Sequence, residues 1–110
     1  PTLGVSPTCV RVPVATGHSE SVHIRCQRPL SVAEVRAALS DAPGVTLVGD
    51  GYVPGEHPQP AACVGTDEVF VGRIREDLAL PGAINMWIVA DNLRKGAALN
   101  AVQIAERLRR

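Results

Sequence analysis

Aromatic side chains are scarce in this 110-residue sequence, which contains one tryptophan, one tyrosine and one phenylalanine. Apolar residues nonetheless make up 45% of the chain, so its core must consist of valine, leucine, isoleucine and alanine. A chain of this length suits a single domain with one core. We therefore expect one domain over residues 1–110.

Net charge is also missing, because 11 basic residues balance 11 acidic ones. A neutral chain gives no electrostatic argument for binding nucleic acid or an anionic membrane. The longest apolar runs are far shorter than the roughly 20 residues of a bilayer-spanning helix. The first residues, PTLGVSPT, lack the charged start and apolar middle of a signal peptide, and the absent initial methionine predicts processing or a cut chain. We expect no nucleic-acid partner and no membrane partner.

Cysteine and histidine are few and widely spaced. An odd number of cysteines argues against a disulfide framework, and no CxxC spacing typical of zinc sites occurs. The histidines form no ligand pair at helical spacing. We expect no metal site and a reducing cytoplasm as the location. The residues concerned are Cys9, Cys26, Cys63, His18, His23 and His57.

Hydrophobic patterning predicts the order ββαβ-loop-ββα, which indicates an α+β domain with a mixed, largely antiparallel sheet covered by helices. A proline- and glycine-rich loop occupies residues 49–62, and Pro81-Gly82 turns one strand into the next. The expected strands are 8–14, 20–27, 44–49, 68–77 and 84–91. The expected helices are one from Ser31 to the Ala42-Pro43-Gly44 stop, and one over 94–109.

Side-chain spacing within these elements predicts which faces are buried. Ser31 and Glu34 form a capping box at the start of the first helix. In strand 20–27, one set of alternating residues faces the core. The C-terminal helix has an alanine-rich face that would allow close approach of a neighbouring backbone. The expected buried sets are Val32, Val35, Ala38 and Leu39 in the helix, and Val22, Ile24 and Cys26 in the strand.

Two polar residues lie at the ends of the stretch CVRVPVATGHSES, residues 9–21. Arg11 either lies on a solvated sheet face, as charged residues usually do, or binds a carboxylate through two parallel N–H bonds. His18, between Gly17 and Ser19, is either a turn residue without a role or a general acid–base. Cys9 would lie ~20 Å from the turn along an extended strand, so we interpret it as a small hydrophobe rather than a nucleophile.

A third polar residue stands in the stretch VADNLRKGAALNAVQIAERL, residues 89–108. Asn92 falls between a strand that ends at Asp91 and a helix with small residues in its first turns. It either caps the helix or belongs to a helix start whose N–H groups contact a polar ligand.

Together these two stretches resemble the aspartate-semialdehyde dehydrogenase family, and VGRIR at 71–75 and the tryptophan strand after it fit as well. The resemblance implies part of a glyceraldehyde-3-phosphate dehydrogenase-like C-terminal domain. It implies that Arg11 holds the substrate carboxylate, that His18 is the acid–base residue and that Asn92 lies near the nicotinamide of NADP. The implied reaction is NADPH-dependent reduction of aspartyl 4-phosphate to aspartate semialdehyde and phosphate, in the diaminopimelate, lysine, threonine and methionine pathways.

The resemblance covers the last third of the family's enzymes. The family's nucleophilic cysteine, in an Asn-Cys-Thr context, and its nucleotide-binding domain have no counterpart in this sequence. We therefore expect a partial catalytic and dimerisation domain, inactive alone and prone to form a homo-oligomer. The alternatives are a relative of N-acetyl-glutamyl-phosphate reductase and a non-catalytic oligomerisation module.

Overall fold

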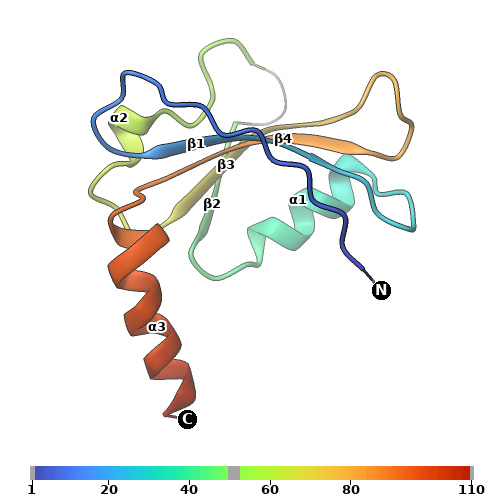
Figure 1. Cartoon of the computed structure of the whole chain (residues 1–110). Coiled ribbons are helices and arrows are strands. Elements are labelled where there is room, and N and C mark those ends of the chain that lie inside the picture. The colour runs from blue at the N-terminus through green and yellow to red at the C-terminus, as the bar shows by residue number, and fades with distance from the viewer. Residues whose placement is uncertain (1, 50–52, 110) are drawn as a thin grey trace.

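The computed structural model describes residues 2–49 and 53–109, and these form one mixed sheet with helices on both sides (Figure 1). In Figure 1, α1 lies below the sheet, α2 lies above it, and α3 extends away from the end of β4. In chain order the elements are β1 (His18–Ile24), α1 (Val32–Ser40), β2 (Val45–Val48), α2 (Pro60–Cys63), β3 (Val69–Glu76), β4 (Ile84–Ala90), the π-helical turn η1 (Arg94–Ala98) and α3 (Leu99–Leu108).

The sheet has the strand order β1-β4-β3-β2. β4 is antiparallel to both of its neighbours, whereas β2 runs parallel to β3. This arrangement confirms the predicted α+β class with a mixed, largely antiparallel sheet. The β3–β4 hairpin turns at Pro81-Gly82 as expected, and Asp77 N–H donates to the carbonyl oxygen of Ala83 at 2.9 Å to close it.

The core lies between α1 and one face of the sheet. Its centre comprises the buried side chains of Val71, Ile74, Ile84 and Met86. From α1, Val32, Val35 and Leu39 pack against this centre as predicted, whereas Ala38 is exposed. The capping box is confirmed: Ser31 Oγ accepts from Glu34 N–H, and Glu34 Oε2 accepts from Ser31 N–H at 2.9 Å.

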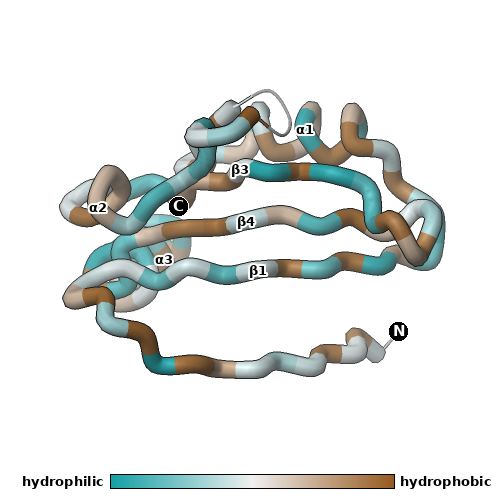
Figure 2. The backbone as a smooth tube through the Cα atoms, turned by 90° about the horizontal axis from the view of Figure 1, so that it is seen from above, coloured by the Kyte–Doolittle hydropathy of each residue, from teal (hydrophilic) through white to brown (hydrophobic). Residues whose placement is uncertain are grey.

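The predicted strand at 8–14 is wrong. These residues form no strand, and Figure 2 shows the segment running beyond the edge strand β1, outside the sheet. Val10, Val12 and Val14 are exposed, and Val14 N–H bonds locally to the carbonyl oxygen of Val12 at 2.8 Å. Pro13 has no N–H to donate to a ladder, and alternating valines do not form a strand without a partner strand beside them.

The second predicted strand is shifted. β1 begins at His18 and ends at Ile24, opposite Ile84, where β4 itself begins. Residues 25–27 therefore have no partner on β4, and Cys26 is exposed instead of buried. Val22 and Ile24 pack against the core as predicted.

The loop predicted at 49–62 ends earlier than expected, because Pro60 begins α2, and residues 50–52 lie outside the described part. The C-terminal helix forms where predicted, but it opens as a π-turn: Ala98 N–H donates to the carbonyl oxygen of Leu93 at 3.3 Å. Its apolar positions are exposed, with Val102 at 54% and Leu108 at 83%. The helix thus has an apolar face that the described residues leave uncovered.

Candidate functional site

His18 is the first residue of β1 and lies opposite Ala90, near the end of β4. Its side chain is exposed. The preceding residue, Gly17, has φ of 99°, a left-handed conformation that favours glycine. The sequence places glycine here because the chain must turn sharply before it enters the strand.

A side chain from the other end of the domain holds this turn. The N–H of Gly17 donates to Oδ1 of Asn92 at 2.8 Å, although the two residues are 75 positions apart. Both residues are partly buried. The structure therefore brings His18 and Asn92, two of the three predicted site residues, to the same end of the β1–β4 pair.

Arg11 is not brought to them by any contact in the described residues. It lies in the exposed N-terminal segment, and its side chain makes no hydrogen bond or ion pair with a described residue. The guanidinium that is predicted to bind a carboxylate therefore has no partner among the described residues. A guanidinium must be free in this way if it is to bind the carboxylate of a ligand. Because residues 8–14 form no strand, no sheet register fixes the position of Arg11 relative to His18. Sequence patterning predicts such a register.

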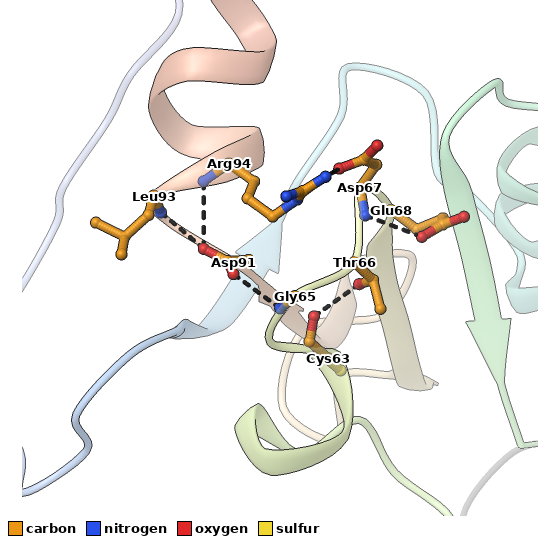
Figure 3. Close-up of polar contacts among 8 residues, drawn as sticks. All are labelled: Cys63, Gly65, Thr66, Asp67, Glu68, Asp91, Leu93 and Arg94. Atoms are coloured by element: carbon orange, nitrogen blue, oxygen red, sulfur yellow. Dashed lines mark hydrogen bonds and ion pairs between the residues drawn. The ribbon is translucent and has the colours of Figure 1, made fainter.

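Asp91, which sequence analysis does not identify as a site residue, is a buried hydrogen-bond acceptor beside Asn92. It is 4% exposed and accepts three backbone hydrogen bonds (Figure 3). Oδ2 accepts from Gly65 N–H at 2.9 Å, and Oδ1 accepts from the N–H groups of Leu93 at 2.8 Å and Arg94 at 3.2 Å. The pKa of Asp91 is lowered from its ordinary value mainly by the hydrogen bond from Gly65 N–H, and also by those from Leu93 and Arg94. Burial acts in the opposite direction and would raise this pKa. The position of Asp91 between a strand and a helix was the available signal, but it indicates only where the strand ends.

The segment after α2 adjoins this carboxylate. Thr66 Oγ1 donates to the carbonyl oxygen of Cys63 at 2.6 Å, and Arg94 Nε donates to Oδ1 of Asp67 at 2.6 Å (Figure 3). The Arg94–Asp67 pair is about half exposed on both sides, so solvent screens it strongly. Asp91 therefore connects the end of β4 with turn 64–67 and with the start of the C-terminal helix. The Arg94–Asp67 pair makes a second, weaker connection between that turn and that helix.

An open hollow of about 510 Å³ lies next to the turn that carries His18. Most of its lining is apolar, and Thr16 and Gln59 add polar groups. The lining residues are Val14, Ala15, Thr16, Gln59, Pro60, Ala61 and Val64.

The cysteines divide into one buried and two exposed thiols. Cys63 is buried in the core, and burial raises the pKa of its thiol. Cys9 and Cys26 are exposed, so the expectation that they fill a sheet or a core is wrong. Both lie outside the strands, because 8–14 forms none and β1 ends at Ile24.

Within residues 2–49 and 53–109, no three histidine, cysteine or acidic side chains are grouped so that they could hold a metal ion. No helix in the same residues has the length and apolar character needed to cross a bilayer.

Comparison with known proteins identifies the class of this domain. Residues 1–95 match the family model described as semialdehyde dehydrogenase, dimerisation domain. The chain therefore belongs to the semialdehyde dehydrogenase family, as a dimerisation domain.

Within that family, the similar proteins are aspartate-semialdehyde dehydrogenases, as the sequence motifs indicated. The enzyme of Legionella pneumophila is 56% identical over 107 residues, which are 96% of this chain and 30% of that protein. The Bacillus subtilis enzyme is 50% identical over 113 residues, covering the whole chain and 32% of that protein. The chain thus spans about a third of the length of these relatives.

Solved structures agree. The crystal structure of aspartate semialdehyde dehydrogenase II from Vibrio cholerae, complexed with ASA, superposes with a TM-score of 0.81 and 46% identity, over 91% of this chain and 29% of that one. A probable aspartate-semialdehyde dehydrogenase from Pseudomonas aeruginosa gives 0.78 and 43%, over 87% and 28%.

Proposed function

We propose that this chain is the dimerisation part, with some of the catalytic residues, of an NADP-dependent aspartate-semialdehyde dehydrogenase. The observation that carries the proposal is the 56% identity to the Legionella pneumophila enzyme over 96% of the chain. The contact between Gly17 and Asn92 supports it, because it joins the two motifs on which the resemblance rests. The reaction is that of amino-acid biosynthesis: aspartyl 4-phosphate, NADPH and a proton give aspartate semialdehyde, phosphate and NADP.

Each predicted residue has a distinct task in this proposal. The guanidinium of Arg11, which has no partner among the described residues, binds the substrate's α-carboxylate through two parallel N–H bonds. His18, exposed at the start of β1, exchanges the proton at the reacting carbonyl. The nucleophilic thiolate comes from outside this chain, since Cys63 is buried with a raised pKa and neither exposed cysteine lies in a strand or helix that would fix it.

Asn92 fits the nicotinamide end of NADP at one point. Its Oδ1 is engaged by Gly17, whereas its Nδ2 has no partner among the described residues. That N–H₂ group would donate to a carboxamide oxygen of the cofactor. When bound, the cofactor supplies the hydride.

The test is a graft of this chain into the Legionella pneumophila enzyme in place of the segment that it matches. We expect the graft to oxidise aspartate semialdehyde in the presence of phosphate, with NADPH formation followed by its absorbance. His18→Asn should lower kcat about 10²–10⁴-fold with little change in KM. Arg11→Leu should raise the KM for the semialdehyde. Glu20→Gln, a neighbouring exposed change on β1, is the matched control and should leave both constants unchanged.

A folded, dimeric graft whose kcat is insensitive to His18→Asn would contradict the acid–base role. An unchanged KM in Arg11→Leu would contradict the carboxylate role. The isolated chain should show no turnover in the same assay, and turnover above background would overturn the proposal that it is inactive alone.

A second candidate is a non-catalytic oligomerisation module in the cytoplasm, which the dimerisation-domain family favours. Light scattering on the isolated chain should show a dimer or larger assembly, because its apolar helix face is uncovered and burial contributes about 25 cal/mol per Å². The graft separates the two candidates. A graft that dimerises without turnover favours the module, whereas a graft with turnover favours the enzyme.

A further inference from the structure

The backbone just before His18 is fixed from two sides. On one side the N–H of Gly17 donates to Oδ1 of Asn92 at 2.8 Å. On the other side Gly17 packs so closely that an added Cβ would lie 3.2 Å from Cγ2 of Val64 and 3.3 Å from Cβ of Pro60. The direction in which β1 begins, and with it the place of the His18 side chain, therefore depends on these two contacts.

One carboxylate holds the residues that make both contacts. Asp91 accepts from Gly65, the neighbour of Val64, and from Leu93, the neighbour of Asn92. Asp91 is only 4% exposed, so water competes little for its hydrogen bonds. Turn 64–65 and Asn92 are consequently held at a fixed separation, with Gly17 between them.

We propose that Asn92 is a positioning residue for His18, acting through its side-chain oxygen on the N–H of Gly17, and that Asp91 supports it. The proposal rests on the proposed function for the role of His18, but the contact itself does not. It goes beyond the cofactor contact implied by the family resemblance, since that contact would use Nδ2 and this one uses Oδ1.

The use of two different atoms makes the roles separable. Asn92→Asp keeps an oxygen that accepts from Gly17 and removes the N–H₂ donor. Asn92→Ala removes both. A residue that served the cofactor alone would give the same outcome for both variants, whereas a positioning residue is rescued by aspartate.

The first measurement is amide hydrogen exchange in the isolated chain, followed by NMR, which needs neither substrate nor cofactor. Relative to the parent, Asn92→Ala should speed exchange at Gly17 about tenfold, the equivalent of losing one hydrogen bond. It should also shift the His18 ring resonances. Asn92→Asp should leave the Gly17 rate within about threefold of the parent. Amides of the central strands β3 and β4 report general destabilisation and should stay unchanged in both variants.

Asp91→Asn tests the supporting residue. Its amide would turn an N–H₂ group toward either Gly65 N–H or the N–H groups of Leu93 and Arg94, so one set of bonds is lost. Exchange at both Gly65 and Gly17 should therefore accelerate. If Asp91→Asn unfolds, the comparison of the variants Asn92→Ala and Asn92→Asp still decides the proposal.

The proposal is overturned if Gly17 exchange in Asn92→Ala equals that of the parent, or if Asn92→Asp exposes Gly17 as much as alanine does. Kinetics of the graft then tests the link to His18. We expect Asn92→Ala to lower kcat about tenfold more than Asn92→Asp, while both raise the KM for NADP. If His18→Asn leaves kcat unchanged but Gly17 behaves as expected, the acid–base role of His18 fails and the contact between Gly17 and Asn92 stands.

Discussion

The indole N–H of Trp87 donates to the carbonyl oxygen of Pro58 at 3.0 Å, and this bond ties the loop before α2 to the face of the sheet opposite α1. Gly72, the partner of Trp87 on β3, lies so close to the same proline that an added Cβ would be 2.6 Å from Pro58 Cδ. Pro58 is buried. The loop therefore lies across the sheet at one defined point, and it leads directly into the α2 turn against which Gly17 packs.

Gly72→Ala should destabilise the domain, because the new Cβ would stand 2.6 Å from Cδ of Pro58 and 2.9 Å from the carbonyl oxygen of Val48. Overpacking of this kind costs about 1–3 kcal/mol. Urea unfolding followed by the fluorescence of Trp87 measures it. Gly4→Ala is the matched control, since no atom lies within 4 Å of its added Cβ. Equal midpoints for the two variants would show that the loop does not rest on Gly72.

The Ser31–Glu34 capping box should titrate in acid. The N–H of Ser31, then the side chains of Arg28 and Ser31, lower the pKa of Glu34 from 4.5 to about 2. A lowered pKa means that the charged form favours the folded state, so this contribution is complete above pH 4.5 and is lost as the pH falls toward 2.

We expect an NMR titration of the Glu34 carboxyl with a midpoint near 2, and Ser31→Ala should raise that midpoint toward 4.5. The same substitution removes the N-cap and should cost about 1 kcal/mol of stability at pH 7. Ser6→Ala, in the exposed N-terminal segment, is the control. A Glu34 midpoint that stays at 4.5 in the parent chain would contradict the capping box.

Asp77 should behave similarly at the β3–β4 turn. Asn85 Nδ2 donates to its Oδ2 at 2.8 Å, and the N–H groups of Ala79 and Leu80 donate to its Oδ1. These bonds lower the pKa of Asp77 from 3.8 to about 2, and the bond from Asn85 has the largest effect.

Asn85→Leu should therefore raise the Asp77 titration midpoint toward 3.8, measured by NMR. Because the pKa is lowered in the folded state, the hairpin loses this contribution only as the pH falls from 3.8 toward 2. Asn100→Leu, an exposed asparagine on α3, serves as the control and should leave Asp77 unchanged. If the Asp77 midpoint does not shift in Asn85→Leu, the N–H groups of Ala79 and Leu80 alone are enough to lower its pKa.

Local patterns predicted this fold well, and long-range contacts limited the prediction. The capping box and the Pro81-Gly82 hairpin depend on residues a few positions apart, so their sequence signals are complete. Strand 8–14 failed because pairing requires a neighbouring strand, and valine alternation carries no information about one. Cys26 was misplaced for the same reason, since β4 begins opposite Ile24.

The candidate site was predictable only in part. The motifs identified His18 and Asn92, but the bond between Gly17 and Asn92 spans 75 positions and leaves no periodic trace in the sequence. The sequence indicates Asp91 only as the end of a strand, and its bond to Gly65 connects it to the turn after α2 as well. At the π-turn after it, the carbonyl oxygen of Asp91 accepts from the N–H groups of both Lys95 and Gly96, a detail that composition does not encode.

Thiol chemistry provides the last prediction, because the three cysteines differ in accessibility. Cys63 is 2% exposed, and burial raises the pKa of its thiol, so it supplies little reactive thiolate near neutral pH. Cys9 and Cys26 are exposed and free. In the folded chain, Ellman's reagent should therefore modify two thiols quickly, and the third only after urea unfolds the domain. A double variant, Cys9→Ser with Cys26→Ser, should remove the rapid phase and keep the slow one. Rapid modification of Cys63 in that double variant would show that α2 opens readily, and it would then weaken the view that turn 64–65 gives Gly17 a rigid support.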